Sequence, residues 1–227
     1  MQPIKDYILS ELKFHGYEIS AGITNHLKDQ VVAETSPLIN LFTVLYFHEM
    51  RQEPDNPQGN RDDHLVVSHL SSLPYLLGAL AQAGHLPWNQ INNQFLWLEK
   101  EARSHSSLLK LPGLSGITAV PQMGAEFANG LALSGKFSRL PSRVYYLFAP
   151  EANPKLFEPA FSAAKVPLDN LTYIVPGLER ENRLLLIHRW FALGWQIEEV
   201  DFASFDSILT GFAHASSYWG RPCIIIG

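Results

Sequence analysis

Short strand-like runs alternate with helical patterns through the second half of the chain, and this alternation constrains the fold most. Runs rich in β-branched and aromatic residues occupy 143–148 (RVYYLF), 171–175 (LTYIV), 195–200 (WQIEEV) and 222–226 (PCIII). Near-continuous apolar runs of this length are typical of strands buried on both faces. Helical spacing of apolar residues separates them, as at 205–212 and at 182–193, which Gly194 is expected to end. The pattern predicts βαβ units around a mostly parallel sheet.

The first half is predicted to be more helical. Residues 73–80 and 88–98 carry apolar stripes at helical spacing, and 38–50 is apolar all round, which is typical of a buried helix. Residues 64–68 (HLVVS) are the one clear strand there, whereas 52–62 and 111–118 are interpreted as turn-rich breaks. Neither break is long or biased enough to be a linker. We therefore expect one α/β domain, a three-layer sandwich with a mostly parallel sheet.

Composition excludes several classes of protein. The 227 residues carry 17 basic and 22 acidic side chains, and no Lys/Arg stripe is present, which argues against nucleic-acid binding. No run of 18 uncharged apolar residues exists, so no membrane span is expected, and acidic residues interrupt the first residues as they would not in a signal peptide. The single cysteine, Cys223, rules out a disulfide framework and is expected to be a buried, inert thiol. We expect a cytoplasmic globular protein.

Four segments follow one another in an order that is characteristic of one enzyme family. They are LFTVLYFHEM with the strand and helix after it, PGLSGITAVPQMGAEFANGLALSGK, RVYYLF with LFEPAFSAAKVPLDNLTYIV, and FALGWQIEEVDFASFDSILTGFAHASSYWGRPCIIIG. Together they resemble the N-terminal, diphosphate-binding domain of transketolases, which are thiamine-diphosphate enzymes. The resemblance implies the thiamine-diphosphate-binding fold for residues 1–227, with 1–35 as a helical N-terminal extension. It also implies that the pyrimidine-binding and C-terminal domains are absent.

The positions that match the family's metal ligands carry other residues. The family has Gly-Asp-Gly after the strand that matches RVYYLF and an Asn after the next strand, and their oxygens hold the magnesium ion that grips the diphosphate. Ala149, Pro150 and Glu151 match the first motif, and Leu178 matches the Asn. Because proline and leucine offer no oxygen ligand, we expect no metal site and no bound cofactor. The alternative is thiamine diphosphate with magnesium, held with Glu151 and Asn182 as displaced ligands.

Two further turns of the family identify candidate cleft residues. The Ser-Lys-Gly-His turn matches residues 68–71, so Ser71 takes the position of the imidazole and His69 lies two residues away. The Gly-Ser-Leu-Gly-Gln-Gly turn matches residues 119–124, of which Gly124 keeps its glycine. The candidate cleft residues are therefore His69, Ser71, Gln122, Gly124 and Glu151, and no catalytic residue is assigned. For His69 a local hydrogen bond, and for Glu151 a solvated loop position, remain the simpler interpretations.

Three functions fit these observations. The losses concentrate in loops that would touch the cofactor while the core pattern persists, which favours a non-catalytic subunit that works through a partner or a different ligand. The alternative is the diphosphate-binding subunit of a divergent two-chain transketolase that transfers ketol units. The third is an unrelated enzyme that uses His69 or Glu151 in the old cleft. The family buries its dimer contacts at helices matching 38–50 and 119–134, so we expect a homodimer or a heteromer with a pyrimidine-domain chain.

Overall fold

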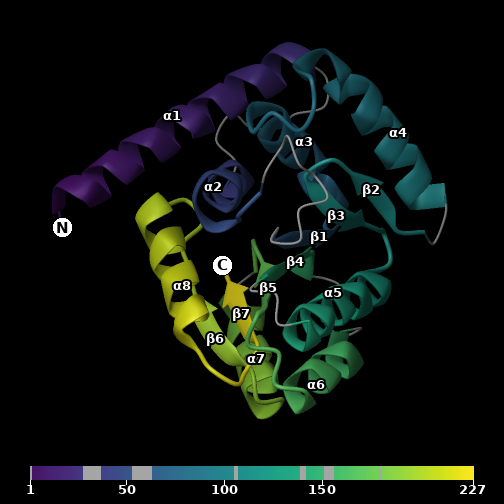
Figure 1. Cartoon of the computed structure of the whole chain (residues 1–227), viewed down its shortest axis with the longest axis vertical. Coiled ribbons are helices and arrows are strands. Elements are labelled where there is room, and N and C mark those ends of the chain that lie inside the picture. The colour runs from purple at the N-terminus through teal and green to yellow at the C-terminus, as the bar shows by residue number, and fades with distance from the viewer. Residues whose placement is uncertain are drawn as a thin grey trace.

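Seven strands of the described residues form one sheet with helices on both faces (Figure 1). The computed structural model describes residues 2–27, 37–52, 63–104, 107–138, 142–150, 156–178 and 180–227. The strands are β1 (His64–Ser68), β2 (Leu109–Leu111), β3 (Leu114–Ile117), β4 (Val144–Phe148), β5 (Leu171–Val175), β6 (Gln196–Glu199) and β7 (Cys223–Ile226). Their order is β2-β3-β1-β4-β5-β7-β6, and only β2 runs antiparallel to its neighbour. The predicted mostly parallel α/β sandwich is confirmed.

Two helical layers cover the sheet. One face is covered by α1 (Gln2–His26), α2 (Pro37–Val44), α3 (Leu73–Gln82), α4 (Ile91–Ser104) and α8 (Phe205–Ser217). The other is covered by α5 (Pro121–Phe137), α6 (Phe157–Lys165) and α7 (Arg180–Ala192). Short turns of π-helix, η1 (Leu45–Glu49), and 3₁₀ helix, η2 (Leu70–Ser72) and η3 (Trp88–Gln90), complete the described elements. Among the helices of the described residues, none has both the length and the apolarity needed to cross a membrane.

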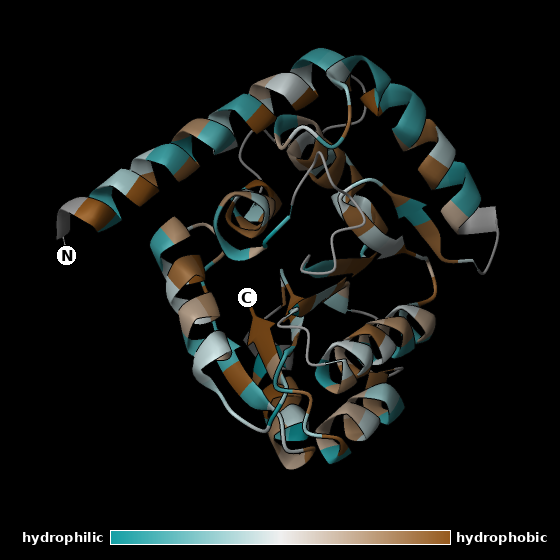
Figure 2. Cartoon of the chain, viewed as in Figure 1, coloured by the Kyte–Doolittle hydropathy of each residue, from teal (hydrophilic) through white to brown (hydrophobic). Residues whose placement is uncertain are grey.

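The strands are apolar on both sides because both sides are covered. In β4, Tyr145 and Leu147 belong to the core under α8, whereas Tyr146 and Phe148 belong to the core under α5 to α7. All of these side chains are buried. In Figure 2 the strands at the centre are largely brown, whereas the outer helices α1 and α4 carry many teal residues. Gly194 ends α7 with a φ of +88°, as the sequence predicts.

Two details of the first half differ from expectation. Segment 111–118 is not a turn-rich break, because it holds the last residue of β2 and the whole of β3, which form a hairpin. The described part of this half therefore has three strands. The strand pattern of the segment is weak since Gly116 has no side chain and Leu108 fills the place, with Leu108 Cδ1 only 2.7 Å from where a Cβ of residue 116 would lie. The buried helix expected at 38–50 is regular as far as Val44 and then widens into the π-helical η1.

The helix α2 is buried within one chain, contrary to the expectation that it offers an apolar face to a partner. Ile39, Leu41, Phe42 and Val44 are all buried. The helix packs against α1, α3 and α8 (Figure 1). Helix α1 therefore covers the surface that the resemblance would assign to dimer contacts. The outer side of α1 itself carries exposed apolar residues, among them Tyr7 and Tyr17.

Cys223 is expected to resist thiol reagents in the folded protein. The side chain is 2% exposed in β7, and burial, together with the charge of Glu198, raises the pKa of the thiol. Less reactive thiolate is therefore present at pH 8 than for a free cysteine. Labelling with a chromogenic disulfide should be negligible over an hour under native conditions and complete within minutes in guanidinium chloride. Rapid stoichiometric labelling of the folded chain would contradict this packing.

Candidate functional site

The carboxyl edge of the sheet contains a point where the chain connections diverge. Strand β1 lies between β3 and β4. The connection from β1 to β3 runs through α3 and α4 on one face, whereas the connection from β3 to β4 runs through α5 on the other. Ligands of parallel α/β sheets bind at such switch points, outside the carboxyl ends of the strands. The candidate site is therefore the edge formed by the end of β1 and the beginning of α5.

The first turn of α5 faces this edge. Pro121 opens the helix after Val120, whose N–H donates to Thr118 Oγ1 at 3.1 Å. The hydroxyl of Tyr146 on β4 donates to the Pro121 carbonyl at 2.7 Å, which ties the turn to the sheet. In this turn the N–H groups of Gln122 and Met123 have no acceptor inside the helix, and the positive end of the helix dipole lies there. Pro121 has no N–H, and the N–H of Gly124 donates to the Val120 carbonyl at 3.1 Å. This arrangement suits an anionic group such as a diphosphate.

Gly124 allows α5 to approach the end of β1 closely. A Cβ at this position would lie 2.3 Å from Ser68 Oγ and 2.9 Å from Cε2 of Tyr146. The Ser68 side chain is 6% exposed, and its hydroxyl lies beside that of Tyr146 without a hydrogen-bond partner of ordinary geometry in the described part of the chain. A buried hydroxyl without a partner is costly unless a ligand or water satisfies it. The end of β1 thus adds a side-chain donor to the first turn of α5.

The structure brings His69 and Ser71 together but places Gln122 on an exposed surface. His69 Nδ1 and Ser71 Oγ are 3.2 Å apart in the turn that follows β1. Gln122 is exposed, and its Nε2 donates to Glu126 Oε1 at 3.0 Å along α5. Glu151 lies outside the described residues, and so does the side chain of Asn182. The roles of the five predicted cleft residues remain predictions.

The two positions that match the family's metal ligands hold no oxygen-bearing side chain. Pro150 follows β4, and Leu178 is buried in the core beneath α7, with its N–H donating to the Gly227 carbonyl at 2.8 Å. No group of three or more His, Cys, Asp or Glu side chains suited to a metal occurs among the described residues. The described residues therefore fit a diphosphate group but do not fit magnesium at these two positions.

Substitution of Gly124 by alanine is expected to destabilise the protein by about 1–3 kcal/mol, because the new methyl group overlaps Ser68 and Tyr146. Gly130 in the same helix is the matched control, since a Cβ there would meet no atom within 4 Å. Gly130→Ala should stabilise the helix by up to about 1 kcal/mol. Urea denaturation of both variants measures the difference. Equal changes would show that α5 does not pack closely against β1.

No family model matches the sequence. Among curated proteins, the chain is 26% identical over 203 residues to the 6-deoxy-6-sulfo-D-fructose transketolase subunit SqwG of Clostridium sp. (strain MSTE9), covering 83% of this chain and 72% of that protein. It is 23% identical over 199 residues to one subunit of the apulose-4-phosphate transketolase of Phocaeicola vulgatus, and this alignment covers 83% of this chain and 70% of that protein. Among solved structures, transketolase from Leishmania mexicana superposes with a TM-score of 0.72 at 17% identity, over 95% of this chain and 36% of that one. The chain is a transketolase-like protein.

The transketolase-like chain spans about a third of the full-length enzymes that it matches. Human transketolase is 27% identical over 198 residues, which are 82% of this chain and 31% of that protein. Transketolase from Campylobacter jejuni has a TM-score of 0.69 at 20% identity over 97% of this chain and 37% of that one. The fold is that of the transketolase N-terminal domain, as the resemblance implies.

The expectation that this transketolase-like chain has no cofactor is wrong. Its relatives are transketolase subunits, and transketolases depend on thiamine diphosphate and a metal. The expectation rested on two substituted side chains, at Pro150 and Leu178. A helix terminus, however, binds a diphosphate through backbone N–H groups, which side-chain substitutions do not reveal.

Sequence reasoning misses the parts of the site that depend on packing. The sequence marks Ser68 only as the start of a turn, and Tyr146 only as part of an apolar strand. One signal is present, because the hydroxyl of a tyrosine within a buried run needs a partner. The partner, the Pro121 carbonyl at 2.7 Å, lies 25 positions away along the chain.

Proposed function

We propose that the chain is the diphosphate-binding subunit of a two-chain, thiamine-diphosphate-dependent transketolase that transfers ketol units. The observation that carries this proposal is the match to two relatives named as transketolase subunits, each over 83% of this chain and at least 70% of the relative. The fold supports it, since the transketolase N-terminal domain supplies the same sheet and helices. A partner chain with a pyrimidine-binding domain would complete the enzyme.

Residues of the carboxyl edge would hold the cofactor. The backbone N–H groups of the first turn of α5 would bind the diphosphate, and the Ser68 hydroxyl would donate to it. Thiamine diphosphate, when bound, supplies the stabilised carbanion that ketol transfer requires. Tyr146 fixes the turn through its hydrogen bond to Pro121. His69 and Ser71, 3.2 Å apart, are assigned to the substrate side of the same edge, where their side chains can bind hydroxyl groups.

The test is reconstitution of activity with a tagged partner chain that carries a pyrimidine-binding domain. We expect each chain alone to be inactive and the co-purified pair to transfer ketol units only when thiamine diphosphate is added. Ser68→Ala should raise the half-saturating concentration of thiamine diphosphate about tenfold or more, since a hydrogen bond to a charged group contributes about 1.5–3 kcal/mol. The control is Ser134→Ala on the exposed side of α5. Association without turnover at saturating cofactor would contradict the proposal and favour a non-catalytic subunit.

A further inference from the structure

A cavity of about 700 Å³ lies at the opposite edge of the sheet from Ser68. Asp63, Arg143 and Asn170 line it, and each directly precedes a strand, β1, β4 and β5 respectively. Lys136 lines it near the end of α5, and Trp219 lines it from the segment between α8 and β7. We call this space the amino-edge cavity. A five-residue strand such as β1 separates the two edges by about 13 Å, so one small ligand does not reach both.

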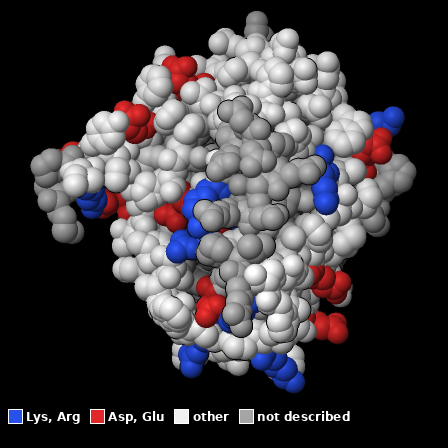
Figure 3. All heavy atoms as spheres, viewed as in Figure 1, with Lys and Arg blue, Asp and Glu red and all other residues white. Residues whose placement is uncertain are grey.

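The charges of the amino-edge cavity are arranged with the anions behind the cations. The Asp63 side chain is 1% exposed and its partner Arg51 is 54% exposed. Glu49 and Arg143 repeat this arrangement, because the Glu49 side chain is 9% exposed and the Arg143 side chain is 44% exposed. Lys and Arg side chains are visible beside Asp and Glu near the middle of the face shown in Figure 3. The third pair of the cavity is Lys136 with Asp169, 2.9 Å apart and with side chains that are 36% and 26% exposed. In each of the three pairs the cation is the more exposed group.

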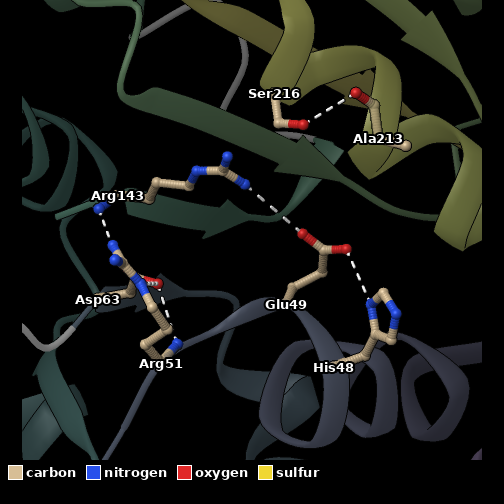
Figure 4. Close-up of polar contacts among 7 residues, drawn as sticks. All are labelled: His48, Glu49, Arg51, Asp63, Arg143, Ala213 and Ser216. Atoms are coloured by element: carbon tan, nitrogen blue, oxygen red, sulfur yellow. Dashed lines mark hydrogen bonds and ion pairs between the residues drawn. The ribbon is translucent and has the colours of Figure 1, made fainter. Parts of the chain in front are cut away.

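Buried carboxylates hold these cations in place (Figure 4). Asp63 accepts hydrogen bonds from the backbone N–H groups of Arg51 and Arg143 at 2.9 and 2.7 Å and from Arg51 Nη2 at 3.0 Å. The π-helical η1 ends at Glu49, whose Oε2 lies 3.9 Å from Arg143 Nη1. That distance exceeds a hydrogen bond, so the Arg143 guanidinium is oriented by Glu49 without donating to it. Its planar donors match the geometry of a phosphate or carboxylate.

Two buried polar atoms near the cavity have no hydrogen-bond partner in the described part of the chain, and only one of them, on Asn170, belongs to a residue that lines it. The Tyr145 hydroxyl, on a side chain that is 2% exposed, lies within electrostatic reach of Glu49, Asp63 and Arg143. Asn170 donates to the carbonyls of Ala132 and Ser142, at 3.0 and 3.2 Å, while its Oδ1 accepts nothing. The amide oxygen of Asn170 can accept from a ligand hydroxyl, whereas Tyr145 is not among the described residues that line the cavity.

We propose that the amino-edge cavity binds a small phosphate-class oxyanion. Arg143 and Lys136 supply the charge, and Trp219 forms the exposed rim. Inorganic phosphate and a hydroxyl-bearing phosphate ester share this chemistry. The free acceptor on Asn170 can accept from a P–OH group of inorganic phosphate or from a carbon-bound hydroxyl of the ester, so the relative affinity of the two distinguishes them.

The test uses the full chain labelled with ¹⁵N and follows the indole N–H signals of its tryptophans during titration with sodium phosphate or glycerol 3-phosphate at constant ionic strength. Trp219→Phe assigns the rim signal. We expect that signal to shift saturably with either anion. Arg143→Gln should weaken binding about tenfold or more, whereas Lys110→Gln, which removes an exposed cation on β2, should change it less than twofold. The affinity of Arg143→Lys should fall between those of the other two variants, since lysine keeps the charge but lacks the planar pair of donors that a guanidinium offers.

Tighter binding of glycerol 3-phosphate supports an ester as the ligand, and equal binding supports the free anion. A melting temperature within a few degrees of the parent chain shows that Arg143→Gln is folded. A Trp219 signal that does not move, that moves equally with sodium chloride, or that responds unchanged in folded Arg143→Gln would overturn the proposal.

Discussion

Replacing Trp190 by alanine is expected to lower the free energy of unfolding by about 3–5 kcal/mol. Trp190 lies on α7 and its side chain is fully buried against the sheet. Its ring lies 4.8 Å from that of Trp195 and 5.7 Å from that of Tyr173, centroid to centroid. The substitution leaves a cavity in the aromatic cluster that holds α6 and α7 on the sheet. Urea denaturation followed by far-ultraviolet circular dichroism measures the loss.

Trp219→Ala is the matched control for Trp190→Ala. The Trp219 side chain is 89% exposed, so its removal should change the free energy of unfolding by less than about 0.5 kcal/mol. A small loss in both variants would show that the aromatic cluster does not anchor α7. A large loss in both would show that Trp219 is covered.

Replacing Asp63 by alanine is expected to cost about 3 kcal/mol of stability. The carboxylate is buried and accepts from two backbone N–H groups and from the Arg51 side chain, all of which lose their acceptor in the variant. The control is Asp206→Ala, since Asp206 is 51% exposed and paired with Lys5, and such pairs contribute about 0–1 kcal/mol. Chemical denaturation of both variants gives the comparison. Equal and small losses would contradict the anchoring role of Asp63 between β1 and β4.

The sequence predicts the centre of the sheet better than its edge. Strands β1, β4, β5 and β7 are buried on both faces, so long apolar runs mark them. Strands β2 and β3 are three and four residues long, and Gly116 removes a side chain from the pattern. The π-helical η1 also escapes prediction, because 38–50 is apolar at every helical phase and spacing alone does not show where the helix widens.

The site could be predicted in position but not in contacts. The resemblance places residues 68–71 and Gly124 at one edge, since the carboxyl ends of parallel strands meet there. Whether a hydroxyl such as that of Ser68 is left without a partner depends on the packing of α5, which one sequence does not reveal. The amino-edge cavity joins Glu49, Asp63 and Arg143 from distant parts of the chain, and no local pattern marks such a set.

The carboxyl edge is expected to bind thiamine diphosphate once the partner chain is present. Isothermal titration of thiamine diphosphate with magnesium into the co-purified pair tests it directly. The account predicts a saturable heat for the pair, at least tenfold weaker affinity for Ser68→Ala, and unchanged affinity for Ser134→Ala. No heat of binding to an intact pair at millimolar thiamine diphosphate would contradict it.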